Sequence, residues 1–408
     1  MVARSPVPPE KRLSQEAINI LLIHFIFTVG LSMAGVFLNL YLWRLSENLM
    51  VNAYYHLIFF AVSWVSFGIS GWFVKKRDRI MIYRLGIALV SLFYLSVIVV
   101  RENLVQYYTL FAVLQAFVMA FYWIGYLTLM YDVSNEHNRM RFLALNLTIF
   151  TLGTLSGPLI AGNIIHYQEG LRGYTIVFSI ATLMFMIATR LSFKIPSLQL
   201  PPKPMYIRQT ITLILKNRIW QKSLLSFTVI GTFQGLMIFL PNILLYRFVP
   251  REDLIGYLGM MYSSMTIIMS MINSRIAQPE KSKLYITIAA CLTITGSVIL
   301  WFNMSLWSVI IFMSLYSLSV PLQWNSLTTN YFAIISNLPL RGNMRVESMV
   351  VREGALNTGR FFAVLLLIVC INDLSSQQLP LILIGISLIQ FVNVFIFKQM
   401  KSKSKSTV

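Results

Sequence analysis

The sequence contains few charged residues, and acidic residues are the scarcest of them. Only 12% of the 408 residues are charged, with 14 Asp and Glu against 33 Lys and Arg. Soluble domains carry about 25% charged and about 45–50% apolar residues, whereas 57% of this chain is apolar. The composition excludes an ordinary soluble protein and predicts a membrane protein with many spans.

Cysteine and histidine are also scarce, which argues against several kinds of site. Cys291 and Cys370 lie in separate apolar runs, so we expect neither a disulfide framework nor a thiolate metal site. The four histidines form no ligand pair; they are His24, His56, His137 and His166. Because no nucleophile–base pair or phosphate-binding loop is present either, we expect no metal, no cofactor and no enzyme activity.

Long apolar runs, in contrast, are abundant. A helix needs roughly 20 mainly apolar residues to cross a bilayer, whereas a barrel strand needs about 9–11, so these runs predict helices. The twelve predicted spans are about 17–43, 50–74, 80–100, 105–131, 142–166, 173–194, 221–246, 254–275, 284–302, 305–334, 354–372 and 378–397. The preceding tail lacks a signal-peptide cleavage pattern, so we keep the first run as a span.

The basic residues are distributed unevenly between the two sides of the membrane. With both termini cytoplasmic, the basic residues on the outer side are only Arg44, Arg101, Arg172, Arg247 and Arg251. This asymmetry fixes the topology and accounts for the net charge of +19 without a nucleic-acid partner. We therefore expect a multi-pass plasma-membrane protein, and the short outer loops favour a bacterial one.

A proline-rich linker divides the chain into two halves. The segment IPSLQLPPKP (195–204) holds four prolines and cannot be a span. The segment that follows it, 206–221, mixes apolar and basic residues and is predicted to lie along the cytoplasmic membrane surface. The predicted divisions are an N-terminal tail (1–16), an N-terminal six-helix bundle (17–194), a central loop (195–220), a C-terminal six-helix bundle (221–397) and a basic tail (398–408).

The two halves repeat each other in register. The matches are RxxALN at 141–146 and 352–357, the runs beginning Phe-Thr-Val at 27–44 and 227–247, and Trp123 with Trp324. In each match the partner lies six spans later, so corresponding helices cross the membrane in the same direction. A parallel repeat of this kind is typical of transporters built from two bundles.

On these features the chain resembles the major facilitator superfamily across essentially its whole length. The resemblance implies an all-α membrane protein whose two six-helix bundles are related by a pseudo-two-fold axis along the membrane normal. In the fifth span, Gly153, Gly157, Pro158 and Gly162 fit the family's antiporter motif, with alanine at two further glycine positions. Close helix packing alone would explain small residues there; within the family, the motif is commoner in exporters.

A second family motif follows the second span but departs from the usual pattern. Gly71 and Arg79 match it, Asp78 takes a glycine position, and Lys75 stands where the family has an acid. In the family that acid helps to close the cytoplasmic gate, so the resemblance implies gating roles for this loop. The alternative is a set of basic anchors at the membrane surface.

Two pairs of arginines occupy equivalent places in the two halves. Arg141 and Arg352 lie at the cytoplasmic ends of spans five and eleven, where we expect them to contribute to topology and gating. Arg44 and Arg247 end spans one and seven on the outer side and are candidates for an outer gate. The available acidic partners are Glu47, Glu252 and Asp253. Ordinary anchoring at the membrane interface is the alternative.

Polar and aromatic side chains concentrate in the spans that line the family's substrate path near the midplane. Because a polar side chain facing lipid is penalised, we expect these residues to point inward, where rings and amides suit an amphipathic ligand. The predicted substrate-binding residues are Asn39, Gln115, Tyr122, Trp123, Tyr126, Gln234, Asn242, Gln323, Trp324, Asn325 and Arg360. Hydrogen bonds between helices are the alternative explanation.

Arg360 is unusual because, at 1.5 Å per residue, it lies roughly 9–12 Å into its predicted span. An arginine inside a membrane is costly and is by default a functional candidate. The alternatives are that it extends to the cytoplasmic face or pairs with Glu353. No Asp or Glu lies in the middle third of any predicted span, so His24 is the remaining titratable candidate for proton coupling.

The sequence therefore predicts a monomeric transporter that moves a small organic, amphipathic solute by alternating access, with export favoured. Its partners would be the lipid bilayer and a small-molecule or lipid-like substrate. One alternative is a flippase of a lipid-linked substrate, in which Arg360 and the outer arginines contact the headgroup. The other is a membrane scaffold or sensor without transport, which the missing carboxylates favour.

The predicted path gives a first test. Trp123→Ala and Trp324→Ala should each reduce transport without preventing membrane insertion, because both rings are predicted to line the cavity. Flux into proteoliposomes, normalised to inserted protein, measures the effect. Normal flux in both variants would contradict this placement of the cavity.

Overall fold

The fold is known from a computed structural model. The structure describes residues 12–134, 138–196, 203–276, 278–336, 344–371 and 378–397. The predicted basic tail (398–408), most of the N-terminal tail and much of the proline-rich linker lie outside these ranges. Within them the chain is almost entirely helical and contains no strand.

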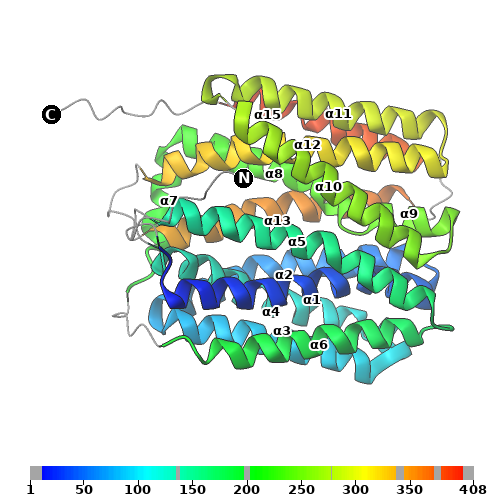
Figure 1. The fold of residues 1–408 in the computed structure, drawn as a ribbon. Coiled ribbons are helices and arrows are strands. Elements are labelled where there is room, and N and C mark those ends of the chain that lie inside the picture. The colour runs from blue at the N-terminus through cyan, green and yellow to red at the C-terminus, as the bar shows by residue number, and fades with distance from the viewer. Residues whose placement is uncertain are drawn as a thin grey trace, which may run out of the picture.

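The helices follow the two halves of the sequence (Figure 1). The first half contains α1 (Gln15–Ser46), α2 (Leu49–Lys76), α3 (Arg79–Val100), the short η2 (Arg101–Val105), α4 (Tyr108–Asp132), α5 (Arg139–His166) and α6 (Arg172–Ser192). The second contains α7 (Ile207–Lys216), α8 (Arg218–Met237), α9 (Leu240–Phe248), α10 (Glu252–Ile276), η3 (Pro279–Lys281), α11 (Ser282–Phe302), α12 (Leu306–Ser336), α13 (Arg345–Cys370), α14 (Gln378–Ile389) and α15 (Val392–Ile396).

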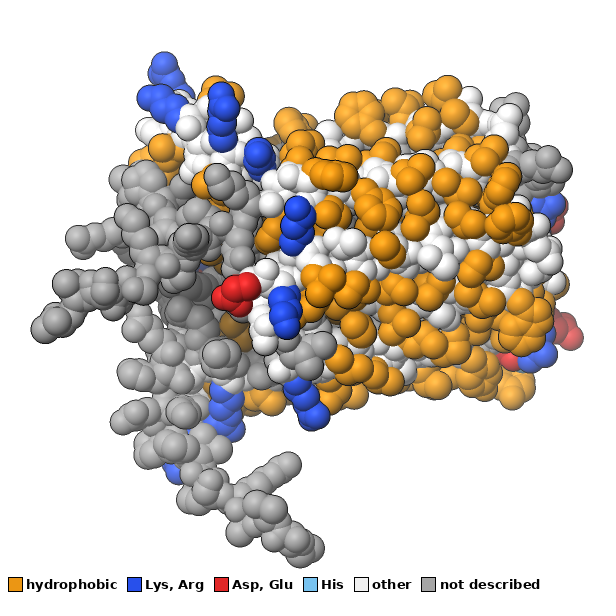
Figure 2. All heavy atoms as spheres, turned by 90° about the horizontal axis from the view of Figure 1, so that it is seen from above, with side chains coloured by type: hydrophobic (Ala, Val, Ile, Leu, Met, Phe, Trp, Pro, Cys, Tyr) orange, Lys and Arg blue, Asp and Glu red, His pale blue; other side chains and the backbone are white. Residues whose placement is uncertain are grey.

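Twelve segments are long and apolar enough to cross a membrane, as the sequence predicts. Three of them combine consecutive helices: α3 with η2, α8 with α9, and α14 with α15. Hydrocarbon offers no hydrogen-bond partners, so a spanning backbone must satisfy its own polar groups, which a helix does. Figure 2 shows apolar side chains covering the middle of the molecule and charged side chains gathered toward its ends. The protein is therefore a multi-pass membrane protein.

The two ends of the bundle differ in charge. The α2–α3 junction carries Lys75, Lys76, Arg77 and Arg79, and we call the end that contains it the basic end. The other end, where α1 meets α2 and α9 meets α10, is called the opposite end. Polar side chains begin several helices at these ends: the Asp78 carboxylate, for example, accepts a hydrogen bond from the Ile80 backbone N–H, at 3.1 Å.

Helix packing reproduces the six-span repeat. Within the first bundle α1 packs on α5, α2 on α4 and α3 on α6; within the second, α8 packs on α13, α10 on α12 and α11 on α14. The bundles meet through α5 with α10 and through α13 with α2, which are equivalent pairs in the repeat. This arrangement is the predicted pair of six-helix bundles related by a pseudo-two-fold axis.

Three spans differ from their predictions, and the twelfth is divided into α14 and α15. The seventh span is interrupted between α8 and α9, because Pro241 in the first turn of α9 lacks the N–H that a continuous helix would use. The eleventh span begins at Arg345, well before residue 354. The hydropathy pattern missed this first part of α13 because the part is charged. The second RxxALN match, at 352–357, therefore lies wholly inside the helix.

Close packing of α3 on α4 gives a stability test. A Cβ atom at Gly86 would lie 2.5 Å from the Tyr122 backbone nitrogen, whereas a Cβ atom at Gly68 would meet nothing within 4 Å. Gly86→Ala should therefore lower the unfolding temperature in detergent. The matched Gly68→Ala should leave it unchanged or raise it, since alanine is up to ~1 kcal/mol better than glycine in a helix. Equal effects of both substitutions would contradict the described packing.

Candidate functional site

An ion pair joins the two bundles at the opposite end. Arg44 at the end of α1 donates to the Glu252 carboxylate at the start of α10, with Nη1 and Oε1 2.8 Å apart. The Tyr174 hydroxyl donates to the same oxygen at 3.1 Å, and the rings of Tyr174 and Tyr246 lie 5.7 and 5.9 Å from the Arg44 guanidinium carbon. Of the three acids named as candidate partners of Arg44, the one that pairs with it is thus Glu252.

Small residues of the antiporter motif form a second contact at this end, between α5 and α10. A Cβ atom at Gly162 would lie 2.5 Å from the Glu252 carbonyl oxygen, and one at Gly256 would lie 2.5 Å from the Pro158 carbonyl oxygen. Backbones can approach this closely only where side chains are absent. Gly162 and Pro158 therefore hold the two bundles together directly beside the Arg44–Glu252 pair.

The other two motif glycines, Gly153 and Gly157, pack against α1 inside the first bundle. A Cβ atom at Gly153 would lie 2.7 Å from the Thr28 methyl carbon on α1, and one at Gly157 would overlap the Ser32 hydroxyl. The Ser32 hydroxyl donates to the Gly153 carbonyl oxygen at 2.7 Å. One face of α5 is thus fixed to α1 while its other face contacts α10.

At the basic end, a buried ion pair joins α2 to α13. The Lys75 ammonium donates to the Glu347 carboxylate, and their side chains are only 5% and 0% exposed. Nearby, the Trp64 indole N–H donates to the Gly354 carbonyl oxygen at 2.6 Å. A Cβ atom at Gly71 would lie 2.9 Å from the Val350 side chain. Three points along α2 therefore touch the same helix of the other bundle.

The segment 203–206 forms hydrogen bonds with both residues of this ion pair. The Lys203 backbone N–H donates to the Lys75 carbonyl oxygen at 2.9 Å, and the Lys75 ammonium donates to the Pro204 carbonyl oxygen at 3.2 Å. The Tyr206 backbone N–H donates to the Glu347 carboxylate at 2.7 Å. The segment bonds to both partners. If α2 separated from α13, the segment would therefore lose its hydrogen bonds to at least one of the two helices.

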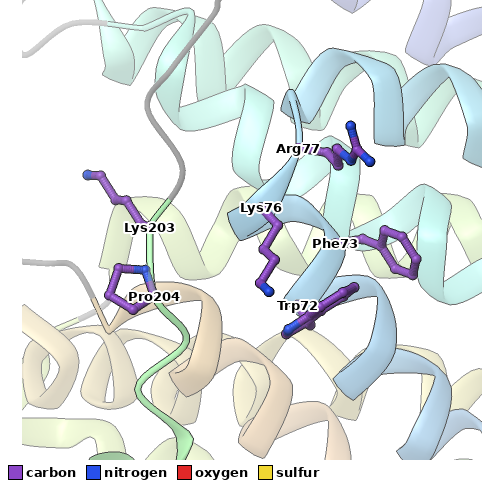
Figure 3. Close-up of a pocket in the computed structure, with 6 residues that line it drawn as sticks. All are labelled: Trp72, Phe73, Lys76, Arg77, Lys203 and Pro204. Carbon is purple, nitrogen blue, oxygen red and sulfur yellow. The ribbon is translucent and has the colours of Figure 1, made fainter.

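A cavity of about 600 Å³ lies beside this contact (Figure 3). Its described lining comes from the end of α2 and from the connecting segment: Trp72, Phe73, Lys76, Arg77, Lys203 and Pro204. Figure 3 shows Lys76 directed toward the Trp72 ring, whose centre is 4.5 Å from the ammonium nitrogen. The cavity is therefore part of the surroundings of the basic-end contact rather than of the predicted substrate path.

Two of the remaining predicted gating residues, Arg79 and Arg352, form ion pairs within a single bundle. Arg79 pairs with Asp132, which joins α3 to α4 inside one bundle. Arg352 is buried and pairs with the adjacent Glu353 at 2.7 Å, whereas its repeat partner Arg141 is exposed. Arg247, the counterpart of Arg44, is exposed on α9. The two members of each arginine pair thus differ in exposure.

In the first bundle, the predicted binding residues of α4 surround His24. The Tyr122 hydroxyl lies 2.7 Å from His24 Nδ1, and the Tyr126 ring stacks on the imidazole with centres 3.9 Å apart. The Trp123 ring meets the imidazole edge-on at 6.3 Å. Gln115 lies apart from this cluster and accepts a hydrogen bond from the Tyr55 hydroxyl at 2.8 Å.

Asn39 connects the first bundle to the break in the seventh span. Its amide nitrogen donates to the Ile238 carbonyl oxygen at 3.2 Å, an oxygen at the α8–α9 break. Its amide oxygen lies 2.9 Å from His56 Nε2, and the His56 ring stacks on Phe239 at 4.8 Å. Asn242, which the repeat aligns with Asn39, is half-buried on α9.

In the second bundle, three predicted residues line one small cavity of about 20 Å³: Gln234, Gln323 and Trp324. This volume holds about one water molecule. Its lining also includes Tyr316, and the Gln323 amide donates to the Gln390 side chain at 3.0 Å. Asn325 points away from this group and is exposed.

Arg360 reaches toward this cavity from α13. Its Nη2 donates to the Gln234 side-chain oxygen at 2.8 Å and its Nη1 to the Asn357 side-chain oxygen at 3.1 Å. On its other side, the guanidinium carbon lies 5.8 Å from the centre of the Phe60 ring on α2. Arg360 thus lies where the second bundle faces the first, and its described hydrogen bonds go to amides rather than to Glu353.

Sequence reasoning missed several residues of these contacts, notably Glu347, His56 and Phe60. A signal for Glu347 was present, because a lysine in the place of the family's acid calls for an acid on the facing helix. His56 and Phe60 carried no such signal. Their positions depend on how α2 packs against α8, α9 and α13.

Known sequences resemble this chain over most of its length. The family model of the Major Facilitator Superfamily matches residues 20–344. A Bacillus subtilis (strain 168) protein named "Uncharacterized protein YqgE" is 23% identical over 393 residues, covering 95% of this chain and 91% of that protein. A Geobacillus stearothermophilus protein named "Uncharacterized protein in sodM 3'region" is 27% identical over 169 residues, covering 41% and 79%.

Solved structures with a similar fold include two transporters. A D-xylose-proton symporter superposes with a TM-score of 0.73 at 10% identity, covering 96% of this chain and 99% of that chain. The human organic anion transporter MFSD10 (TETRAN) superposes with a TM-score of 0.67 at 14% identity, covering 96% and 100%. At these identities the likeness concerns the fold alone.

The buried pair at the basic end can be tested by exchanging its charges. Lys75→Glu and Glu347→Lys should each lower stability by roughly 3–5 kcal/mol, because each leaves like charges buried together. The double variant should recover most of the loss, measured as the unfolding temperature in detergent. Arg251→Gln is the control: Arg251 is 57% exposed in its pair with Asp253, and such pairs contribute about 0–1 kcal/mol. A double variant no better than the worse single variant would exclude a direct pair.

Proposed function

This chain is a member of the Major Facilitator Superfamily, and we propose that it transports a small organic, amphipathic solute by alternating access. The observation that carries the proposal is that two ionic contacts join the bundles at opposite ends through different helices. Arg44–Glu252 joins α1 to α10, and Lys75–Glu347 joins α2 to α13. Alternating access requires two closures of this kind, so that one can break while the other holds.

The chemistry of the region between the two contacts supports an amphipathic solute. It offers aromatic rings on α4 and α12 together with the amides of Gln234 and Gln323. Rings supply apolar contact area and amides fix orientation. The predicted substrate residues that already bond within the protein, such as Asn39 and Gln115, would have to exchange those bonds for bonds to the solute.

We further propose that the basic end faces the cytoplasm of a bacterial cell and that the protein acts as a monomer in the plasma membrane. The clustered lysines and arginines at the α2–α3 junction support this orientation. Export is the favoured direction, since the antiporter-motif residues Pro158 and Gly162 form the contact at the end that would face outward.

The proposal is tested by a thermal-shift screen of the purified protein, followed by flux measurements in proteoliposomes. The panel contains drugs, sugars, organic anions, peptides and lipid precursors at two pH values. A small solute should stabilise the protein by about 2.7 kcal/mol at one hundred times its Kd, and the same solute should cross the membrane. Stabilisation by lipid precursors alone would favour a flippase, and stabilisation by no class would favour a scaffold or sensor.

A further inference from the structure

The positive charge of Arg360 is placed unlike any other in the protein. Arg360 lies farther from the ends of its helix than any other charged residue in the described membrane-crossing helices. It is also beside the interface of the two bundles, with Gln234 of α8 on one side and Phe60 of α2 on the other. A charge in this position is costly and has to be explained.

Among the described residues, no acid neutralises this charge. The two acids of the same helix are engaged elsewhere, Glu347 with Lys75 and Glu353 with Arg352. Arg360 itself forms no ion pair in the described part of the chain, and its two bonded nitrogens donate to neutral amides. The group formed by Arg352, Glu353 and Arg360 therefore keeps one excess positive charge.

One donor of Arg360 is also unused. Its Nε atom is buried and has no hydrogen-bond partner among the described residues. An unsatisfied buried donor costs about 1–3 kcal/mol or more when charged. An arginine retained only for stability would be expected to bond to an acid through its planar fork of N–H groups, as Arg251 does with Asp253 through Nε and Nη2.

The surroundings indicate which kind of partner fits. Gln234, the first partner of Arg360, lines the small cavity together with Tyr316 and Trp324, and Phe60 lies across the bundle interface. A guanidinium binds a carboxylate or phosphate through two parallel hydrogen bonds. The neighbouring rings would contact an apolar body attached to that group.

We propose that the transported solute is an amphipathic organic anion whose single carboxylate or phosphate group binds to Arg360. The inference rests on the proposed transport function and names its substrate class. The anion accepts hydrogen bonds from Nε and from an Nη that now bonds to Gln234. Because the cavity beside Gln234 holds about one water, the solute binds when the bundles have moved apart.

The first experiment compares anionic probes with neutral probes that carry the same phenyl group. Binding to the purified protein is measured for 4-phenylbutyrate and phenyl phosphate, for their neutral counterparts 4-phenylbutyramide and phenol, and for every stabiliser found in the screen above. Inorganic phosphate and a short-chain phosphatidic acid separate an organic solute from a bare ion or a lipid headgroup. We expect anionic organic probes to bind more tightly than their neutral counterparts.

Two variants connect this preference to Arg360. In Arg360→Gln the affinity for anions should fall by about tenfold to a hundredfold, the effect of losing charge-assisted hydrogen bonds. Arg360→Lys keeps the charge but loses the fork, so it should retain part of the preference. Affinity for the neutral probes should fall less than affinity for the anions in both variants, because a neutral acceptor forms a weaker hydrogen bond to arginine.

Stability without any solute gives an independent readout. If Arg360 has no acidic partner until an anion binds, then Arg360→Gln removes an uncompensated charge. The variant should therefore unfold at the same temperature as the unsubstituted protein or at a higher one. Arg352→Gln is the matched control on the same helix: it breaks an existing ion pair with Glu353 and should unfold at a lower temperature. A loss of stability in Arg360→Gln as large as that in Arg352→Gln would contradict the inference.

The outcomes separate the inference from the function on which it rests. Anion binding that depends on Arg360 supports both. Solutes that are all neutral or cationic, anions that bind equally to Arg360→Gln, or binding confined to inorganic phosphate or phosphatidic acid would overturn the substrate class but leave transport standing. If no solute of any charge binds or moves, the proposed function fails and the inference fails with it.

Discussion

The cost of burying charge in a medium without water is the constraint on which this structure depends. A lone ion is strongly penalised there, whereas a pair with good hydrogen bonds is tolerated. In this protein the bundles touch where one bundle supplies a cation and the other an acid, at Arg44–Glu252 and Lys75–Glu347. The connecting segment adds backbone hydrogen bonds to the second pair. Two of the contacts between the halves thus neutralise charge as well as join the bundles.

The same constraint limits how strongly each ion pair holds the bundles together. When two helices separate and water enters, each ion regains hydration, so the net free energy that holds a buried pair together is much smaller than its direct attraction. The contacts at Gly162 and Gly256 differ from the ion pairs because they contribute only van der Waals packing. That packing energy falls steeply as the helices move apart. An ion pair beside a glycine contact can therefore hold one closed arrangement firmly and still release it.

Some parts of the site could be read from local sequence and others could not. The antiporter-motif glycines were recognised because small residues allow close helix packing, whereas Glu252 was only one of three acids offered as a partner to Arg44. Lys75 was recognised as a departure, but its partner Glu347 was not, because the two lie 272 positions apart. The repeat suggested equal roles for Asn39 and Asn242, yet Asn39 bonds to the carbonyl oxygen freed by the α8–α9 break. That break exists in only one half, because of Pro241.

The sequence by itself determined the twelve membrane-crossing segments and the parallel repeat. These follow from apolar length and from residue spacing, which are local properties that hydrocarbon and helix geometry impose on any chain. Only the tertiary structure decided which charges are neutralised. It paired Lys75 with Glu347 and Arg44 with Glu252, and it left Arg360 among neutral amides. Pairing depends on distances between helices that are remote in sequence, and packing alone sets those distances.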